Sequence, residues 1–250
     1  MADRAGQDIG ISVANPLPAG RGYGTSTADI GAALFCCSQA LQFNLTASEA
    51  AHIAVQVEPT DSTFFDGLAL FDHRTGRFFQ LLGEPPPATV VILDPGGTVD
   101  SEEFNVHDWR EPLARKAQEH LRAFQLLQQG IAASDLLAIG EASTLSATCH
   151  QTILFSLLVE MALSLSKQLG AAGICRAHSG TIVGLIFSEE KDPEAIADYL
   201  SKHFAGTVQV RQASLVGGGP RSGEAFGRLA DTLEPALDIR RLERSMAEGV

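Results

Sequence analysis

The segment Leu17–Ala28, which reads Leu-Pro-Ala-Gly-Arg-Gly-Tyr-Gly-Thr-Ser-Thr-Ala, constrains the fold more than any other part of the chain. Its alternating glycines allow the backbone to turn sharply and to approach a ligand closely. The alanine-rich apolar run over residues 26–41 then predicts a helix. The first N–H groups of a helix are unpaired and carry a partial positive charge. A glycine-rich turn leading into such a helix therefore indicates a cradle for phosphate groups.

Spacing separates this loop from two well-known phosphate-binding loops. A P-loop requires Gly-x-x-x-x-Gly-Lys-Ser/Thr, but Thr25 stands where the second glycine would be, and no lysine precedes Lys116. The dinucleotide fingerprint Gly-x-Gly-x-x-Gly also fails, because Gly24 comes one position too early. A glycine-rich turn that binds no ligand is the structural alternative.

The rest of the chain predicts an α+β fold, because strands are mixed with helical hairpins. Glu58 is expected to end the second helix because Pro59 follows it. The expected strands are residues 8–15, 64–71, 77–81, 89–93, 173–177, 181–187 and 208–213. The expected helices are residues 26–41, 109–129, 134–148, 153–169 and 193–203, with a further helix after residue 41 that is capped by Thr46 or Ser48. The proline-rich link 84–87 suggests a division into residues 1–87 and 88–219, with a tail at 220–250 that is either helical or disordered.

The composition of the chain limits the classes of binding partner that can be expected. The formal net charge is −12 and no Lys/Arg-rich stripe is present, which disfavours nucleic acid and an anionic membrane surface. The chain contains no apolar run near the ~18 residues that a membrane span needs, and its first residues lack the apolar core of a signal peptide. We therefore expect a cytoplasmic protein with a small-molecule substrate. Acidity does not forbid ATP, which a local cradle can bind.

The loop resembles the phosphate-binding motif of the GHMP kinases, with Tyr23 in place of the usual Leu or Met and with Thr25 and Thr27 in place of small residues. Further segments resemble the L-threonine kinase branch of that family. These segments are 26–30, 58–63, 70–73, 142–147 and 177–180. The resemblance spans about residues 8 to 219, with the blocks in the family's order.

The resemblance implies a two-layer fold, with an N-terminal part like domain 2 of ribosomal protein S5 and a ferredoxin-like C-terminal part. It implies transfer of phosphate from ATP to the hydroxyl of L-threonine, whose product leads to the aminopropanol linker of cobalamin. It also implies site residues. The residues that would bind ATP are Pro18, Gly20, Gly22, Gly24, Thr25, Ser26 and Thr27. Ser26 and Glu58 would bind Mg²⁺, and His178, Ser179 and Gly180 would bind the acceptor. Asp61 and Ser26 would be the catalytic residues.

Several alternatives stay open at this point. Glu58 and Asp61 could mark a solvated helix end, with Asp61 capping the next turn, and His178 could be a loop histidine satisfied by backbone groups. A homoserine kinase-like enzyme is the nearest alternative activity. The family's opening hairpin, which carries its first motif, is not found before the loop. The resemblance therefore also allows an N-terminally truncated and catalytically incomplete GHMP kinase fragment.

Overall fold

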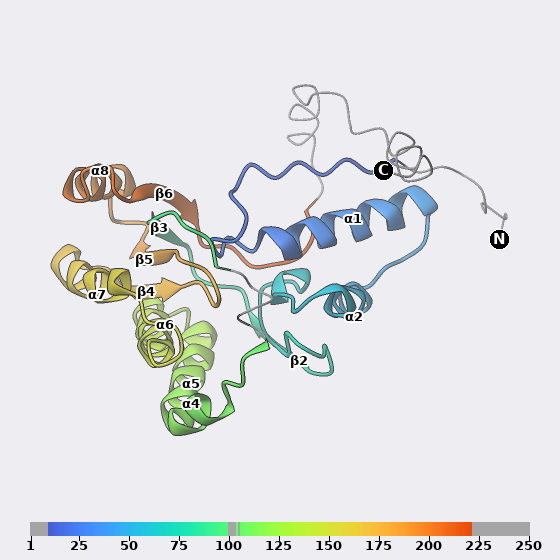
Figure 1. Ribbon diagram of the computed structural model, residues 1–250, viewed down its shortest axis with the longest axis horizontal. Helices are drawn as coiled ribbons and strands as arrows, with labels where there is room; N and C mark the ends of the chain where they lie inside the picture. Colours follow the sequence, from blue (N-terminus) through green and yellow to red (C-terminus); the bar gives the residue numbers. More distant parts are fainter. Residues whose placement is uncertain (1–9, 100–103, 105, 222–250) are drawn as a thin grey trace, which may run out of the picture.

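The computed structural model describes residues 10–99, 104 and 106–221. Within these ranges the chain is α+β, as its sequence predicts, with a two-stranded sheet β1-β2 and a four-stranded sheet in the order β4-β5-β3-β6 (Figure 1). The expected tail lies outside the described residues, apart from its first two. The expected division at 87/88 falls between β2 and β3 and stays a prediction.

The N-terminal part packs two helices on a small sheet. Its elements are α1 (Thr25–Leu41), α2 (Ala47–Val57), the short helix η1 (Ser62–Phe64), β1 (Leu68–Phe71) and β2 (Phe79–Gly83). Thr46 caps α2 through a capping box with Glu49, as one of the two predicted caps. The small core of this part contains Ala50, Ala54 and Phe64, each at most 2% exposed.

The four-stranded sheet is antiparallel throughout. It contains β3 (Ala88–Asp94), β4 (Gly173–Arg176), β5 (Val183–Ser188) and β6 (Gln209–Ser214). Alternate residues of β3, such as Val91 and Leu93, enter the main core beneath α7 (Leu157–Leu169) and α8 (Pro193–His203). The last residue of β3, Asp94, is nevertheless 1% exposed.

Three further helices complete the described fold. They are α4 (Arg110–Arg115), α5 (Ala117–Ala133) and α6 (Leu136–His150). Asp135 caps α6 by accepting hydrogen bonds from the N–H groups of Leu137 and Ala138. The α5–α6 hairpin packs through α6 against β4. This places the C-terminal end of α6, at His150, beside the turn that follows β4.

Some predicted elements differ from the observed ones. Residues 10–15 form no strand, although apolar residues alternate there; Ile11 and Val13 are 46% and 48% exposed, so the alternation has no buried face. The strand expected from residue 64 starts at Leu68, because η1 and the positive φ of Gly67 come first. The helix expected at 109–129 is interrupted at Lys116.

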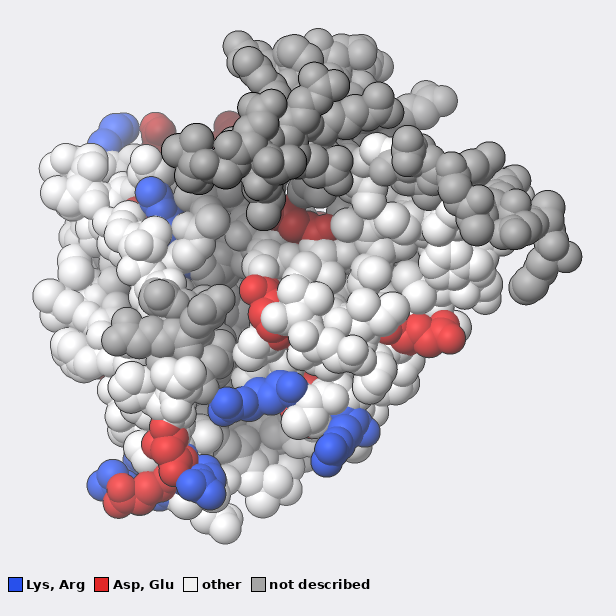
Figure 2. Space-filling view, turned by 45° about the vertical axis from the view of Figure 1, so that its right-hand side comes forward, with Lys and Arg blue, Asp and Glu red and all other residues white. Residues whose placement is uncertain are grey.

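The surface carries mixed charge. On the face in Figure 2, acidic and basic side chains are interspersed over a largely uncharged surface. No helix among the described residues is both long enough and apolar enough to cross a bilayer.

Candidate active site

The glycine loop has the backbone conformation that its composition predicts. Gly20, Gly22 and Gly24 have φ angles of +73°, +100° and +69°, a region that side chains other than glycine rarely adopt. Gly24 is the N-cap of α1 and provides no side-chain cap. The N–H groups of the first turn, at Thr25, Ser26 and Thr27, therefore have no intrahelical partner and suit an anion. Half-buried Pro18 leads into this loop.

The turn between β4 and β5 lies against the loop. The carbonyl of Arg21 accepts hydrogen bonds from the N–H groups of Thr181, at 2.9 Å, and Ile182, at 3.2 Å. A Cβ added at Gly180 would overlap this carbonyl and the Cα of Gly22. The structure therefore brings the predicted acceptor segment 178–180 into direct contact with the predicted phosphate loop (Figure 1).

Two predicted carboxylates meet the start of α1. The Ser26 hydroxyl donates a hydrogen bond to the carboxylate of Glu58, the C-cap of α2. A Cβ added at Gly24 would lie 3.2 Å from Oδ2 of Asp61. Among the described residues no three or more His, Cys, Asp or Glu side chains form a metal-binding group. Ser26 and Glu58 fit Mg²⁺ in the way typical of phosphoryl transfer, where one or two protein oxygens complement phosphate and water.

Thr27 fastens this carboxylate segment to α1. Its buried hydroxyl accepts hydrogen bonds from the hydroxyl of Thr60, at 2.9 Å, and from the N–H of Asp61, at 3.0 Å. The side chain of Thr27 thus faces the segment 58–61, and only its backbone N–H is placed to meet a phosphate. Its position in the predicted ATP-binding set therefore rests on the main chain.

Asp61 sits at the rim of the site. Asp61 is exposed, but partial desolvation by the surrounding protein raises the pKa of its carboxyl. The charge of His73 lowers this pKa, and the charge of Glu58 raises it. Asp61 precedes η1 but its side chain makes no capping hydrogen bond. The geometry therefore does not favour the alternative in which Asp61 only caps a turn.

Histidine rings surround the acceptor segment. The ring of His178 lies 5.2 Å from that of His73 and 5.5 Å from that of His150, measured between centroids, and 5.3 Å from that of Phe104. Nε2 of His150 is 2.7 Å from the carbonyl oxygen of His178. Burial lowers the pKa of His150 to about 4, and the charge of Arg176 acts in the same direction. Burial likewise lowers the pKa of His73 and of His178. These rings are therefore neutral at pH 7.

Sequence patterns gave no role to His73, His150 or Asp94. Asp94 is hydrogen-bonded by two loop residues, Arg21 and Tyr23. The sequence did hold a signal for Asp94, since a carboxylate directly after the apolar run 90–93 requires hydrogen-bond donors when it is buried. His73 lies in segment 70–73, one of the segments that resemble the L-threonine kinase branch. Its position in a turn did not indicate that it lies near Asp61.

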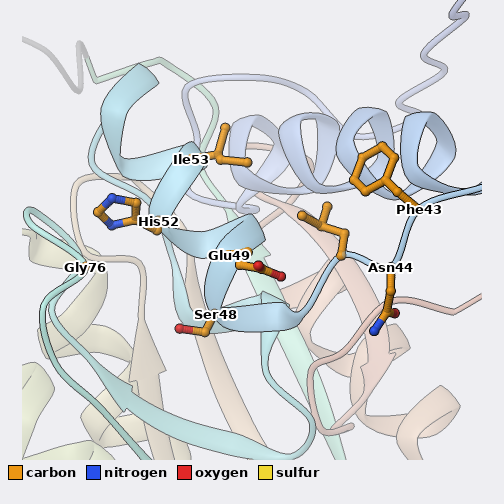
Figure 3. Close-up of a pocket in the computed structure, with 8 residues that line it drawn as sticks. Phe43, Asn44, Ser48, Glu49, His52, Ile53 and Gly76 are labelled. Atoms are coloured by element: carbon orange, nitrogen blue, oxygen red, sulfur yellow. The ribbon is translucent and has the colours of Figure 1, made fainter. Parts of the chain in front are cut away.

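A separate hollow of about 450 Å³ lies beside α2 (Figure 3). It is lined by Phe43, Asn44, Leu45, Ser48, Glu49, His52, Ile53 and Gly76. None of the predicted site residues lines it, so the hollow is distinct from the site at the start of α1.

Two family models match this chain. The model of the GHMP kinases N terminal domain matches residues 1–69, which include the glycine loop and both carboxylates, and the model of the GHMP kinases C terminal domain matches residues 125–206. The chain belongs to the GHMP kinase family. The resemblance carried by the glycine loop is thereby confirmed.

Relatives and solved structures agree with this family. The chain is 31% identical over 184 residues to the L-threonine kinase of Salmonella typhimurium, and 30% identical over 185 residues to that of Citrobacter freundii. Each match covers 74% of this GHMP kinase chain, which spans 61% and 64% of those relatives. A homoserine kinase structure from Cytophaga hutchinsonii shares the fold, with a TM-score of 0.64 at 16% identity over 83% of this chain and 70% of that one.

Proposed function

We propose that this GHMP kinase transfers the γ-phosphoryl group of ATP to the side-chain hydroxyl of L-threonine, giving L-threonine O-3-phosphate. One observation carries the proposal: the start of α1, the carboxylates of Glu58 and Asp61, and the turn 178–180 converge on one glycine loop. The similarity to two L-threonine kinases supports threonine as the acceptor. As the resemblance implies, we propose that the reaction is cytoplasmic and supplies the aminopropanol linker of cobalamin.

The chain's own residues divide the work of phosphoryl transfer, which is mainly positioning and charge neutralisation. N–H groups between Gly22 and Ser26 would hold the β- and γ-phosphates, because the loop and helix start present them together. Ser26 and Glu58 would hold Mg²⁺. When bound, the cation would neutralise charge on the phosphate oxygens. Asp61 would orient the acceptor hydroxyl and accept its proton, a role that a raised carboxyl pKa favours.

The acceptor would lie between Asp61 and the histidine rings. Neutral His73 and His178 flank this region, and Gly180 allows close backbone approach. Ser179 belongs to the same turn and is our proposed donor to the acceptor's carboxylate. Threonine carries a secondary hydroxyl on a branched carbon, so the position of that hydroxyl relative to the carboxylate should distinguish threonine from the longer homoserine.

The proposal is tested by ADP release from the 250-residue chain with Mg-ATP and L-threonine, L-homoserine or mevalonate. We expect threonine to give the highest kcat/KM. Equal or better turnover with homoserine would reassign the acceptor within the family. Nucleotide binding without turnover of any acceptor would support the incomplete-fragment alternative, and repeating the assay with upstream coding sequence restored would then test that alternative.

A further inference from the structure

We infer that Asp94 is a positioning residue for nucleotide binding, which holds the glycine loop through Arg21 and Tyr23. We call these three residues the loop anchor. The inference rests on the proposed function in one respect, namely that the ligand of the loop is a nucleotide phosphate. It adds a residue about 70 positions away from the loop, on the central β3 strand, that no local motif contains.

The geometry of the loop anchor is specific. Oδ2 of Asp94 accepts hydrogen bonds from Nη1 of Arg21 and from the hydroxyl of Tyr23, both at 3.0 Å. Oδ1 accepts one from the N–H of Gly96, at 2.9 Å. The Asp94 side chain is fully buried, whereas the Arg21 side chain is 25% exposed. A buried carboxylate with three donors is satisfied, and loss of any donor leaves it partly unpaired.

Asp94 is itself held rigidly. It ends β3, which pairs with β5 on one side and β6 on the other, and Asp94 is in register with Gln209 of β6. Side chains alternate between the faces of a strand, so Leu93 enters the main core while Asp94 points to the opposite face. The glycine loop lies on that opposite face (Figure 1).

The loop is fastened at alternating positions. Side chains at Arg21 and Tyr23 bind Asp94, and the carbonyl of Gly20 accepts a hydrogen bond from the N–H of Val99, at 2.9 Å. Gly22 and Gly24, between and after the anchored residues, have positive φ angles, as Gly20 does. Anchoring residues 21 and 23 thus fixes the backbone path of the amides predicted to meet phosphate. Preorganisation of this kind strengthens binding because less conformational entropy is lost.

The charge arrangement also suits an anionic ligand. A free carboxylate beside the loop would repel phosphate, but Arg21 neutralises Asp94 within an ion pair. Burial opposes ionisation of Asp94, yet the hydrogen bonds from Gly96, Arg21 and Tyr23 keep its pKa below the ordinary value. Burial and the contact with Asp94 raise the pKa of Tyr23, so its hydroxyl remains a donor.

Tyr23→Phe tests the loop anchor with little change in shape. The measurements are the dissociation constant of Mg·AMPPCP by calorimetry, the KM values for ATP and for L-threonine, and the unfolding temperature. We expect the nucleotide dissociation constant and the KM for ATP to rise about tenfold, since a hydrogen bond to a charged group is lost. The KM for threonine should change less than about twofold. Tyr199→Phe is the matched control, because its hydroxyl accepts a hydrogen bond from Gln168 on the distant α7–α8 surface.

Asp94→Asn provides a second variant, which keeps the side-chain shape and removes the charge. If it folds, its loss of nucleotide affinity should exceed that of Tyr23→Phe, and the two losses should not add in the double variant, because both act through one carboxylate.

A lower unfolding temperature with unchanged nucleotide affinity in Tyr23→Phe would overturn the inference and leave a purely structural contact. Absence of any Mg·AMPPCP binding by the wild-type chain would overturn the inference and the proposed function together. Nucleotide binding without threonine turnover would remove the proposed function alone.

Discussion

The hydroxyl of Ser26 donates a hydrogen bond to the carboxylate of Glu58, joining the first turn of α1 to the end of α2. Ser26 lies in the loop motif and Glu58 lies 32 residues later. Both are oxygen ligands suited to Mg²⁺, and the helix start between them suits phosphate. In the proposed reaction, this pair joins the phosphate-binding start of α1 to the carboxylate segment 58–61.

Removing either side chain of this pair should impair metal-assisted turnover. We expect Ser26→Ala and Glu58→Gln each to lower kcat/KM about a hundredfold and to raise the Mg²⁺ concentration required for half-maximal rate. A magnesium titration of the initial rate measures both effects. Ser38→Ala is the control, because it removes a hydroxyl from the same helix that donates to the Phe35 carbonyl. An unchanged magnesium requirement in both site variants would exclude the assigned ligand role.

Asp61→Asn should separate chemistry from nucleotide binding. The amide keeps the size of the side chain but cannot accept the proton, so kcat should fall by about 10²-fold or more, while the Mg·AMPPCP dissociation constant stays within about threefold. Steady-state kinetics and calorimetry on one preparation measure the two quantities. Wild-type kcat in this variant would show that the enzyme needs no carboxylate base.

Thr27→Val should destabilise the protein and displace the carboxylate segment. Valine keeps the shape but leaves the Thr60 hydroxyl and the Asp61 N–H without their acceptor. Unsatisfied buried groups cost about 1–3 kcal/mol each, so the unfolding temperature should fall by several degrees. Thr27→Ser restores the hydroxyl and should recover most of the stability. Equal melting of the two variants would show that these hydrogen bonds contribute little.

Gly180→Ala should separate the turn 178–180 from the glycine loop. The added methyl group would overlap the backbone at Arg21 and Gly22, so the contact must open at a cost of about 1–3 kcal/mol. We expect lower stability in chemical denaturation and weaker threonine saturation. Gly10→Ala is the control, because a Cβ there has no heavy atom within 4 Å. Wild-type behaviour of Gly180→Ala would mean that the two segments do not touch in solution.

His150 should make stability decline in mild acid. Its pKa is lowered from 6.5 to about 4 by burial and by the charges of Arg176, His178 and His120, whereas the His178 carbonyl favours its protonated form. The unfolded chain therefore binds this proton first. The contribution of neutral His150 to stability is therefore complete above about pH 6.5 and is lost as the pH falls towards 4. In this range the free energy of unfolding should decrease by up to about 1.4 kcal/mol per pH unit.

His150→Gln provides the test of this dependence. Glutamine can still donate to the His178 carbonyl but does not titrate, so its free energy of unfolding should fall less between pH 7 and pH 5 than that of the wild type. Exposed His52→Gln serves as the comparison and should retain the wild-type slope. Parallel curves for wild type and His150→Gln would contradict the assignment.

Local chemistry made much of this site predictable. Alternating glycines before an apolar helix indicated the loop, and Pro59 fixed the end of α2 beside Glu58. Non-local contacts were not predictable in the same way. Asp94 lies 73 positions after Arg21, and the His73–His178 contact joins two turns more than 100 residues apart, so only the tertiary fold brings these residues together. The alternation at residues 10–15 was misleading, because a strand also needs a partner, and the described residues there have none.

The most direct test of the central claim is identification of the product. Phosphorus NMR of a reaction with wild-type chain, Mg-ATP and L-threonine should show a phosphomonoester coupled to the proton on the threonine β-carbon, formed in equal amount with ADP. A spectrum that contains ADP and inorganic phosphate but no such ester would contradict transfer to threonine.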